Sequence, residues 1–198
     1  IMIKKHWNLK YLINKIRYML YLKSNPNLPW LTKDAINIID KLLLPTDNGI
    51  EFGSGRSTIW FSSRINHLIS VEHNSIWYNQ VKNDLNLLKI NNVDLVLKDG
   101  KSYYEILDSI PNSSLNFILI DGLFRKEVFL RSIDKIKIQG YIIFDNANLY
   151  LNNPESISPN SINTTVNDEW LEIHNKIKTY KKTWTTNGIF DTLIIQKT

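Results

Sequence analysis

The chain contains no cysteine, and this absence excludes disulfide bonds, cysteine zinc sites and a thiol nucleophile. It also lacks any run of about 18 consecutive apolar residues, the length that a membrane-spanning helix needs. Its first residues do not form the apolar core of a secretory signal peptide. We therefore expect a cytoplasmic protein without a spanning helix.

Acidic residues are missing from the first 33 positions, so the positive charge of the chain is concentrated at one end. The net charge is +5, but residues 1–33 contribute +7 and the remainder carries −2. A domain that binds nucleic acid normally presents clustered lysine and arginine on its own surface. We therefore predict no nucleic-acid partner for the body of the protein.

The length of 198 residues suits one domain with a substantial core. Hydrophobic residues make up 43% of the chain and charged residues 22%, as in ordinary soluble globular proteins. We divide the chain into a basic, amphipathic helical appendage over residues 1–30 and a single domain over residues 31–198.

The appendage is predicted to contain a helix over residues 3–23, whose apolar stripe is formed by Leu9, Leu12, Ile13, Ile16 and Leu20. One interpretation is that this stripe packs against the body, with lysine stems covering its edges. The other is that it binds a membrane surface or a protein partner. The sequence leaves both open, and it leaves the oligomeric state open as well.

Two closely spaced glycines follow the short apolar run Gly49-Ile50, in the stretch Glu51-Phe52-Gly53-Ser54-Gly55-Arg56-Ser57-Thr58. A helical pattern begins directly afterwards, so the context is a strand, a tight turn and a helix N-terminus. Glycine allows a ligand to approach the backbone, and serine or threonine at a helix start leaves N–H groups free. The turn is therefore a candidate nucleotide-binding loop.

The turn does not match the usual phosphate-binding patterns. A dinucleotide fingerprint requires a third glycine where this chain has Thr58, and the Gly-Lys-Ser/Thr of a phosphate loop is absent. Glu51, at the end of the preceding strand, would repel a phosphate but would favour a positively charged ligand. S-adenosylmethionine carries an amino group and a sulfonium and has no phosphate.

This stretch resembles motif I of the class I S-adenosylmethionine-dependent methyltransferases, in particular those acting on hydroxyls of small molecules. The resemblance extends over roughly residues 32–198. It continues through Val71-Glu72-His73-Asn74, Lys98-Asp99-Gly100, Ile120-Asp121-Gly122 and Gly140-Tyr141-Ile142-Ile143-Phe144-Asp145-Asn146. Each motif is weak alone, but five in this order and spacing form a specific signal.

Short apolar runs alternate with helical patterns from residue 49 to residue 144, which predicts a parallel sheet with helices on both faces. Asn187-Gly188 then separates two further strands and predicts a terminal hairpin. The resemblance implies the same hairpin. We expect an α/β, doubly wound, seven-stranded and mostly parallel sheet with a C-terminal antiparallel hairpin, a Rossmann-like methyltransferase fold.

Five acids fall at or near the predicted carboxyl ends of strands, where ligands bind in open α/β sheets. They are Glu51, Glu72, Asp99, Asp121 and Asp145. The resemblance implies that Glu72 binds the ribose hydroxyls, that Asp99 and Gly100 meet the adenine, and that Glu51 serves the methionine amino group. The full predicted cofactor set is Glu51, Gly53, Ser54, Gly55, Ser57, Thr58, Glu72, His73, Asp99, Gly100 and Asp121.

Asp121, Asp145 and Asn146 form a second group of oxygen donors, of the kind that Mg²⁺ prefers. Their placement resembles the metal site of catechol-type and caffeoyl-coenzyme A-type O-methyltransferases. Those enzymes carry a lysine base three residues after the first aspartate, where this chain has Phe124. Arg125 follows and stays protonated, so it cannot act as a base. Asp121 and Arg125 are the candidate catalytic residues, and the site is a possible Mg²⁺ site.

We predict an S-adenosylmethionine-dependent methyltransferase acting on a hydroxyl of a small molecule, such as a sugar or another secondary metabolite. The absence of an Asn/Asp-Pro-Pro-Tyr motif favours oxygen over nitrogen as the acceptor. Residues 147–167 form a long predicted loop after the fifth strand, which would cover the cleft and select the acceptor. The alternatives are a nicotinamide-dependent reductase and a non-catalytic nucleotide-binding module.

Overall fold

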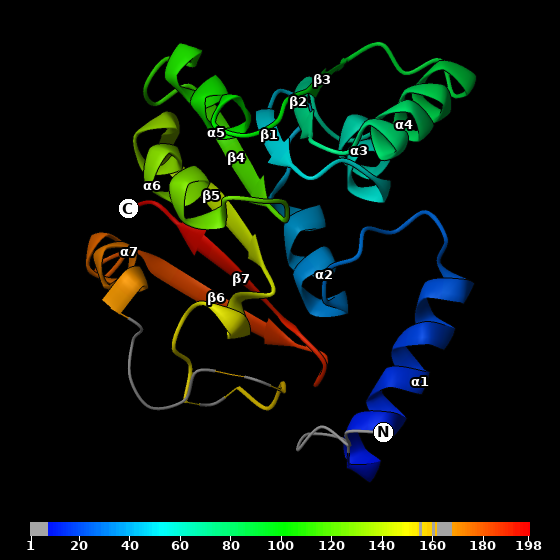
Figure 1. Cartoon of the computed structure of the whole chain (residues 1–198), viewed down its shortest axis with the longest axis vertical. Helices are drawn as coiled ribbons and strands as arrows, with labels where there is room; N and C mark the ends of the chain where they lie inside the picture. Colours follow the sequence, from blue (N-terminus) through cyan, green and yellow to red (C-terminus); the bar gives the residue numbers. More distant parts are fainter. Residues whose placement is uncertain (1–7, 155, 160, 162–167) are drawn as a thin grey trace.

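The computed structural model describes residues 8–154, 156–159, 161 and 168–198. Seven strands form one sheet (Figure 1): β1 Asn48–Phe52, β2 His67–Glu72, β3 Val93–Leu97, β4 Leu115–Ile120, β5 Ile136–Asp145, β6 Lys181–Thr186 and β7 Asp191–Gln196. The α-helices are α1 Leu9–Ser24, α2 Lys33–Leu42, α3 Arg56–Ser62, α4 Ser75–Leu87, α5 Ser102–Glu105, α6 Arg125–Lys135 and α7 Leu171–Lys176. Short 3-10 helices cover Ile106–Ser109, Ala147–Leu149 and Asp168–Trp170.

The strands lie in the order β3-β2-β1-β4-β5-β7-β6. β1 to β5 run parallel, and β7 is antiparallel to both β5 and β6. The chain therefore reverses its winding between β1 and β4, and in parallel sheets ligands bind beside such a reversal. The predicted fold class is confirmed, including the terminal hairpin.

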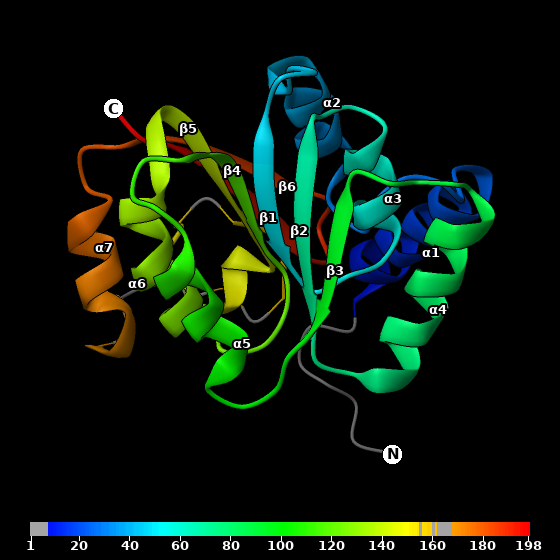
Figure 2. The same cartoon turned by 90° about the horizontal axis from the view of Figure 1, so that it is seen from above.

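Helices cover both faces of the sheet, and each face has its own apolar core (Figure 2). The larger core lies under α5, α6 and α7 and includes Phe129, Phe144 and Trp170. The other lies under α2 and α3 and includes Ile39, Phe61 and Phe117. β4 has its last four residues buried, because both of its faces are covered.

The end of α6 does not follow the apolar spacing of the sequence. Phe129, Ile133 and Ile136 recur at helical spacing, but Ile136 begins β5, which runs ten residues to Asp145. The register between β4 and β5 shifts after Leu115, so extra residues of β5 are accommodated in an irregularity. The helical spacing of Ile136 with Phe129 and Ile133 was therefore misleading.

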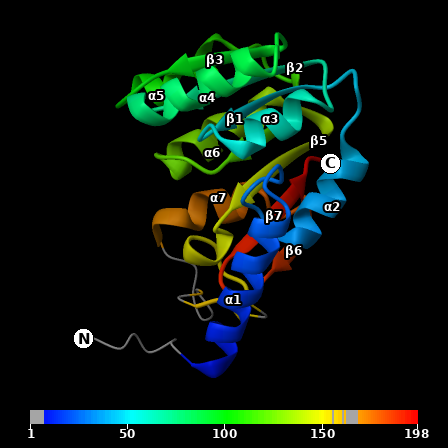
Figure 3. The same cartoon turned by 90° about the vertical axis from the view of Figure 1, so that its right-hand side faces the viewer.

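The apolar stripe of α1 is exposed, so the interpretation that it packs on the body is wrong. Every described residue of the stripe is accessible: Leu9 is 74% exposed, Leu12 52%, Ile13 39%, Ile16 50% and Leu20 60%. α1 lies beside the β6–β7 hairpin (Figure 3) and touches it with its other side. None of the described helices combines the length and apolarity that crossing a bilayer needs.

The segment after β5 is anchored where the structure describes it. Ser156 and Ser158 donate their hydroxyl hydrogens to the carboxylate of Asp191, and Trp184 Nε1 donates to the same group at 2.7 Å. The Asn148 amide oxygen accepts from the backbone N–H of Asp191 at 3.0 Å. This part therefore belongs to the β6–β7 edge of the sheet, while residues 155, 160 and 162–167 of the predicted loop lie outside the described residues.

Candidate active site

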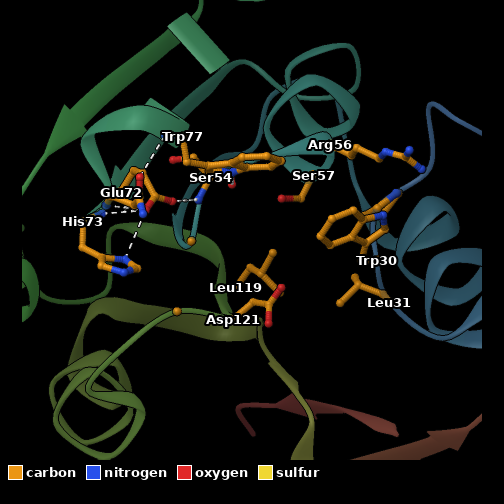
Figure 4. Close-up of a pocket in the computed structure, with 15 residues that line it drawn as sticks. Trp30, Leu31, Ser54, Arg56, Ser57, Glu72, His73, Trp77, Leu119 and Asp121 are labelled. Carbon is orange, nitrogen blue, oxygen red and sulfur yellow. Dashed lines mark hydrogen bonds and ion pairs between the residues drawn. The ribbon is translucent and has the colours of Figure 1, made fainter. Parts of the chain in front are cut away.

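A cavity of about 420 Å³ opens at the carboxyl ends of the central strands (Figure 4). Its size is in the range of small-molecule sites. The walls are formed by Pro29, Trp30, Leu31, Gly53, Ser54, Gly55, Arg56, Ser57, Glu72, His73, Asn74, Trp77, Leu119, Asp121 and Gly122. Seven of the predicted site residues are therefore brought together: Gly53, Ser54, Gly55, Ser57, Glu72, His73 and Asp121.

The loop between β1 and α3 forms the floor of the cavity. Gly53 has φ of +98°, and a Cβ there would lie 3.1 Å from the carbonyl oxygen of Asp121. A side chain at this position would be strained in conformation and would press on the neighbouring strand end. Glycine thus lets the β1 and β4 ends approach each other, and the backbone is open to a ligand at this point.

Glu72 ends β2 and holds this loop in place. Its Oε2 accepts from the backbone N–H of Ser54 at 3.0 Å, and its Oε1 accepts from the N–H groups of His73 and Asn74 at 2.8 and 2.7 Å. His73 Nδ1 lies 3.1 Å from the same Oε1. Glu72 is only 4% exposed but lines the cavity, so its carboxylate is an acceptor in a fixed position at the cavity wall.

Trp77 and Trp30 form an aromatic wall that the sequence did not indicate. The helical spacing of Trp77 with Val81 and Leu85 is typical of a core residue, but its indole N–H donates to the carbonyl oxygen of Ser54 and its ring borders the cavity. Trp30 is half-exposed and lies 6.3 Å from Trp77 between ring centroids. The Arg56 guanidinium lies 5.6 Å from the Trp30 ring. These contacts join distant segments, and only the helical spacing of Trp77 was visible in the sequence.

Glu51 lies beneath the loop and is fully buried. Its Oε1 accepts hydrogen bonds from the hydroxyls of Thr58 and Ser70, while its Oε2 has no hydrogen-bond partner among the described residues. Burial raises the pKa of this carboxyl to about 7, although the hydroxyl donors lower it. Thr58, also predicted for the site, is buried with it and links Glu51 to the N–H of Gly55 at 2.9 Å.

The raised pKa makes stability depend on pH. The folded protein holds the Glu51 proton more tightly than the unfolded chain does, so the free energy of unfolding falls as pH rises from about 4.5 to about 7. We expect the wild type to lose about 3 kcal/mol more than Glu51→Gln between pH 5 and pH 8, measured by urea unfolding. The exposed Glu105→Gln is the control. Equal pH slopes for wild type and Glu51→Gln would contradict the burial effect.

Asp121 follows β4 and is held by Arg125. Arg125 Nη2 donates to Asp121 Oδ1 at 3.1 Å and to the Asp121 carbonyl oxygen at 3.2 Å. Nε donates to the carbonyl oxygen of Gly122, and Nη1 donates to that of Asp145. Arg125 therefore joins the ends of β4 and β5 and compensates the carboxylate charge. Burial raises the pKa of Asp121 to about 6, and the guanidinium opposes this rise. The Asp121 side chain is still 32% exposed and faces the cavity.

Asp145 is buried behind Asp121 and is 3% exposed. Burial and the charge of Asp121 raise its pKa well above the ordinary value. Its Oδ1 accepts from the Thr192 hydroxyl at 2.7 Å, and its Oδ2 accepts from the Asn146 amide at 2.8 Å. A side-chain interaction with Asp145 in turn opposes the rise in the pKa of Asp121. Asp121 and Asp145, which we call the acid pair, therefore interact at the ends of β4 and β5.

These contacts do not fit the predicted Mg²⁺ site. The Asn146 amide donates to Asp145 and does not join it as an oxygen ligand, and both Asp145 oxygens already accept hydrogen bonds. Arg125 occupies the position of the compensating cation beside Asp121. Among the described residues, no cluster of three or more His, Asp or Glu is placed to hold a metal. The prediction of a metal on Asp121, Asp145 and Asn146 is not supported.

Two further predicted residues lie outside the cavity walls. Asp99 and Gly100 are exposed beyond the end of β3.

Tyr18 of α1 is a residue outside the predicted set. It packs edge-on against Phe190, with ring centroids 5.2 Å apart. Burial and the charges of Asp145 and Asp121 raise the pKa of Tyr18. The N-terminal helix thus contacts the β6–β7 turn through a partly buried tyrosine, which no sequence motif indicated.

No protein-family model matches the chain, and no curated protein sequence matches it. Several solved structures, however, are similar to the chain. A proposed caffeoyl-CoA O-methyltransferase from Staphylococcus aureus is 18% identical, with a TM-score of 0.57, over 97% of this chain and 94% of that one. A proposed methyltransferase from Streptococcus mutans, solved in complex with SAH, is 10% identical with a TM-score of 0.62 over 86% and 99%. An rRNA methylase from Streptococcus thermophilus is 11% identical with a TM-score of 0.56 over 81% and 92%.

The strand order, the antiparallel hairpin and these likenesses show that the chain has the class I methyltransferase fold. The predicted recognition of this fold is confirmed. The similar structures carry the names of enzymes for different substrates, including RNA and small molecules, so the acceptor must be argued from the site itself.

Proposed function

We propose that the protein is an S-adenosylmethionine-dependent methyltransferase that transfers the methyl group to a hydroxyl of a small molecule. The observation that carries the proposal is one cavity in which the glycine loop, Glu72 and Asp121 meet at the carboxyl ends of β1, β2 and β4. The SAH complex of a protein with the same fold supports the choice of cofactor.

Each end of the cavity suits one part of the cofactor. Glu72 accepts the two ribose hydroxyls, and His73 borders the neighbouring wall. Asp99 and Gly100 extend this end toward the adenine. Glu51 lies below the glycine loop, and its unpartnered oxygen attracts the methionine amino group, directly or through water. Asp121 faces the reacting end (Figure 4).

Asp121 is the proposed general base. A carboxylate with a pKa of about 6 is mostly ionised at neutral pH and basic enough to receive a proton in the transition state. The acceptor oxygen forms a bond to the methyl carbon while the bond between that carbon and sulfur breaks. The electron pair of the broken bond stays on sulfur, which becomes a neutral thioether. The acceptor proton passes to Asp121. Arg125 positions the carboxylate, and the buried Asp145 lies behind it.

The charge of the body supports a small acceptor, since residues 34–198 carry −2 and a nucleic-acid substrate favours a basic surface. The names of similar structures include rRNA and tRNA methyltransferases, so RNA is the second candidate acceptor. Methyl transfer from labelled cofactor to a panel of hydroxylated small molecules and to RNA distinguishes the two. Label found in RNA alone would reverse our choice.

Calorimetry tests the cofactor directly. We expect S-adenosylmethionine and its demethylated product to bind, and nicotinamide dinucleotides not to bind. Binding of the nicotinamide cofactor alone would instead indicate a reductase. Cofactor binding without turnover on any acceptor would indicate a non-catalytic module.

Trp30 is expected to shield the bound cofactor. Its ring lines the cavity between Arg56 and Trp77 and is half-exposed in the free protein. We expect Trp30→Ala to weaken cofactor binding by about tenfold, from lost aromatic contact, with little change in thermal stability. Trp30→Phe, which keeps an aromatic ring, is the matched control and should recover most of the affinity. Unchanged affinity in Trp30→Ala would mean that residues 25–31 do not cover the ligand.

A further inference from the structure

We propose that α1 docks the protein on a membrane surface that contains anionic lipid. Six apolar side chains of this helix are 39–74% exposed, although the rest of the chain buries two large cores. They are Leu9, Leu12, Ile13, Ile16, Met19 and Leu20, which we call the outer face of α1. Figure 1 shows α1 at the periphery of the molecule, away from the sheet.

The outer face is directed away from the body. At about 100° per residue, its members share one side of the helix, and Asn14 and Tyr18 occupy the opposite side. Tyr18 contacts Phe190, and Asn14 lies against Gly188. A Cβ added at Gly188 would lie only 2.1 Å from the side-chain amide nitrogen of Asn14. The helix is therefore held to the β6–β7 turn by its polar side, and its apolar side is free to contact another surface.

Cations border the outer face. Lys10 and Arg17 lie on one flank and Lys15 on the other, with Lys23 in the last turn. All four are exposed, and within the described residues none forms an ion pair. An apolar strip between cationic flanks is the arrangement of helices that lie in a lipid interface, with apolar groups inserted and cations at the headgroups.

The charges favour lipid over a second copy of the chain. Two copies paired through the outer face would bring lysine and arginine flanks together, and α1 contains no acid to compensate them. Anionic headgroups provide that compensation, because each cation near the surface is attracted to them. The six apolar residues add the burial that charge attraction alone does not supply.

Sedimentation of the full chain with vesicles tests the inference and needs no turnover, so it is independent of the proposed methyltransferase activity. We expect at least about tenfold stronger binding to vesicles containing phosphatidylglycerol than to phosphatidylcholine alone, and a decrease with added salt. Leu12→Gln/Ile16→Gln should weaken binding at least about tenfold, because each removes an inserted side chain. Ile138→Gln, at a 70%-exposed residue of β5, is the control.

Two double variants that remove positive charges distinguish electrostatic attraction to anionic lipid from hydrophobic binding alone. Lys10→Gln/Arg17→Gln should lose at least about tenfold in binding to anionic vesicles, whereas Lys41→Gln/Lys178→Gln elsewhere on the surface should not. Absence of vesicle binding, or binding unchanged by Leu12→Gln/Ile16→Gln, overturns the proposal. Lipid-free self-association that disappears in this variant, without vesicle binding, identifies the outer face as an interface between copies and also overturns it.

Discussion

Asp121→Asn should lower kcat by about a thousandfold, because the neutral amide cannot take the acceptor proton. The substitution keeps the shape of the side chain and an oxygen for Arg125, which lies 3.1 Å from Oδ1 in the wild type. Folding and cofactor affinity should therefore change little. The measurement is steady-state methyl transfer beside calorimetric cofactor binding.

The pH profile gives an independent test of the same role. Burial raises the pKa of Asp121 to about 6, and the base must be ionised, so kcat/KM for the cofactor should rise with pH up to about 6 and then level off. This limb should disappear in Asp121→Asn. Asp108→Asn, at an exposed carboxylate paired with Arg131, is the matched control. A wild-type profile that is flat from pH 5 to pH 8 would exclude Asp121 as the base.

Glu72→Ala should weaken S-adenosylmethionine binding at least about a hundredfold. Two charge-assisted hydrogen bonds to the ribose are lost, each worth about 1.5–3 kcal/mol. The N–H groups of Ser54, His73 and Asn74 also lose their acceptor, so the loop around the ligand is less ordered. The measurement is calorimetric titration, with circular dichroism to verify the fold.

Glu72→Asp separates the two contributions. The shorter side chain keeps the charge but does not reach both the loop and the ribose, so its affinity should lie between those of the wild type and Glu72→Ala. Glu105→Gln, on the exposed part of α5, should bind as the wild type does. Cofactor binding by Glu72→Ala within threefold of wild type, a difference of less than about 0.7 kcal/mol, would show that the ribose lies elsewhere.

Arg125 is the fixed cation beside the acid pair, and it lies 3.1 Å from Asp121 Oδ1. Burial and the charge of Asp121 raise the pKa of Asp145, which reduces the negative charge that the pair carries. A carboxylate that is already paired, and that is raised in pKa by burial, can accept a proton without a metal to activate the acceptor. The proposed base is therefore Asp121, in a chain that carries Phe124 where the resemblance would place a lysine.

Local sequence determined the strands, most of the helices and the glycine loop. Alternation of apolar runs with helical patterns is a property of neighbouring residues, so the order of elements and the position of Glu72 at the end of β2 could be predicted. The same local logic failed at Ile136, where helical spacing continued past the true end of α6.

Tertiary structure alone decided which strand-end acids face the cavity. Glu51 and Asp121 follow the same pattern in the sequence, but one is fully buried under the loop and the other is 32% exposed at the wall. The difference arises from packing between segments far apart in the chain, including the Trp77 contact with Ser54 and the Arg125 bridge between β4 and β5. Tertiary structure also decided that α1 turns Tyr18 toward the body and its apolar stripe toward solvent. An amphipathic pattern defines two faces of a helix but does not determine which face contacts the body.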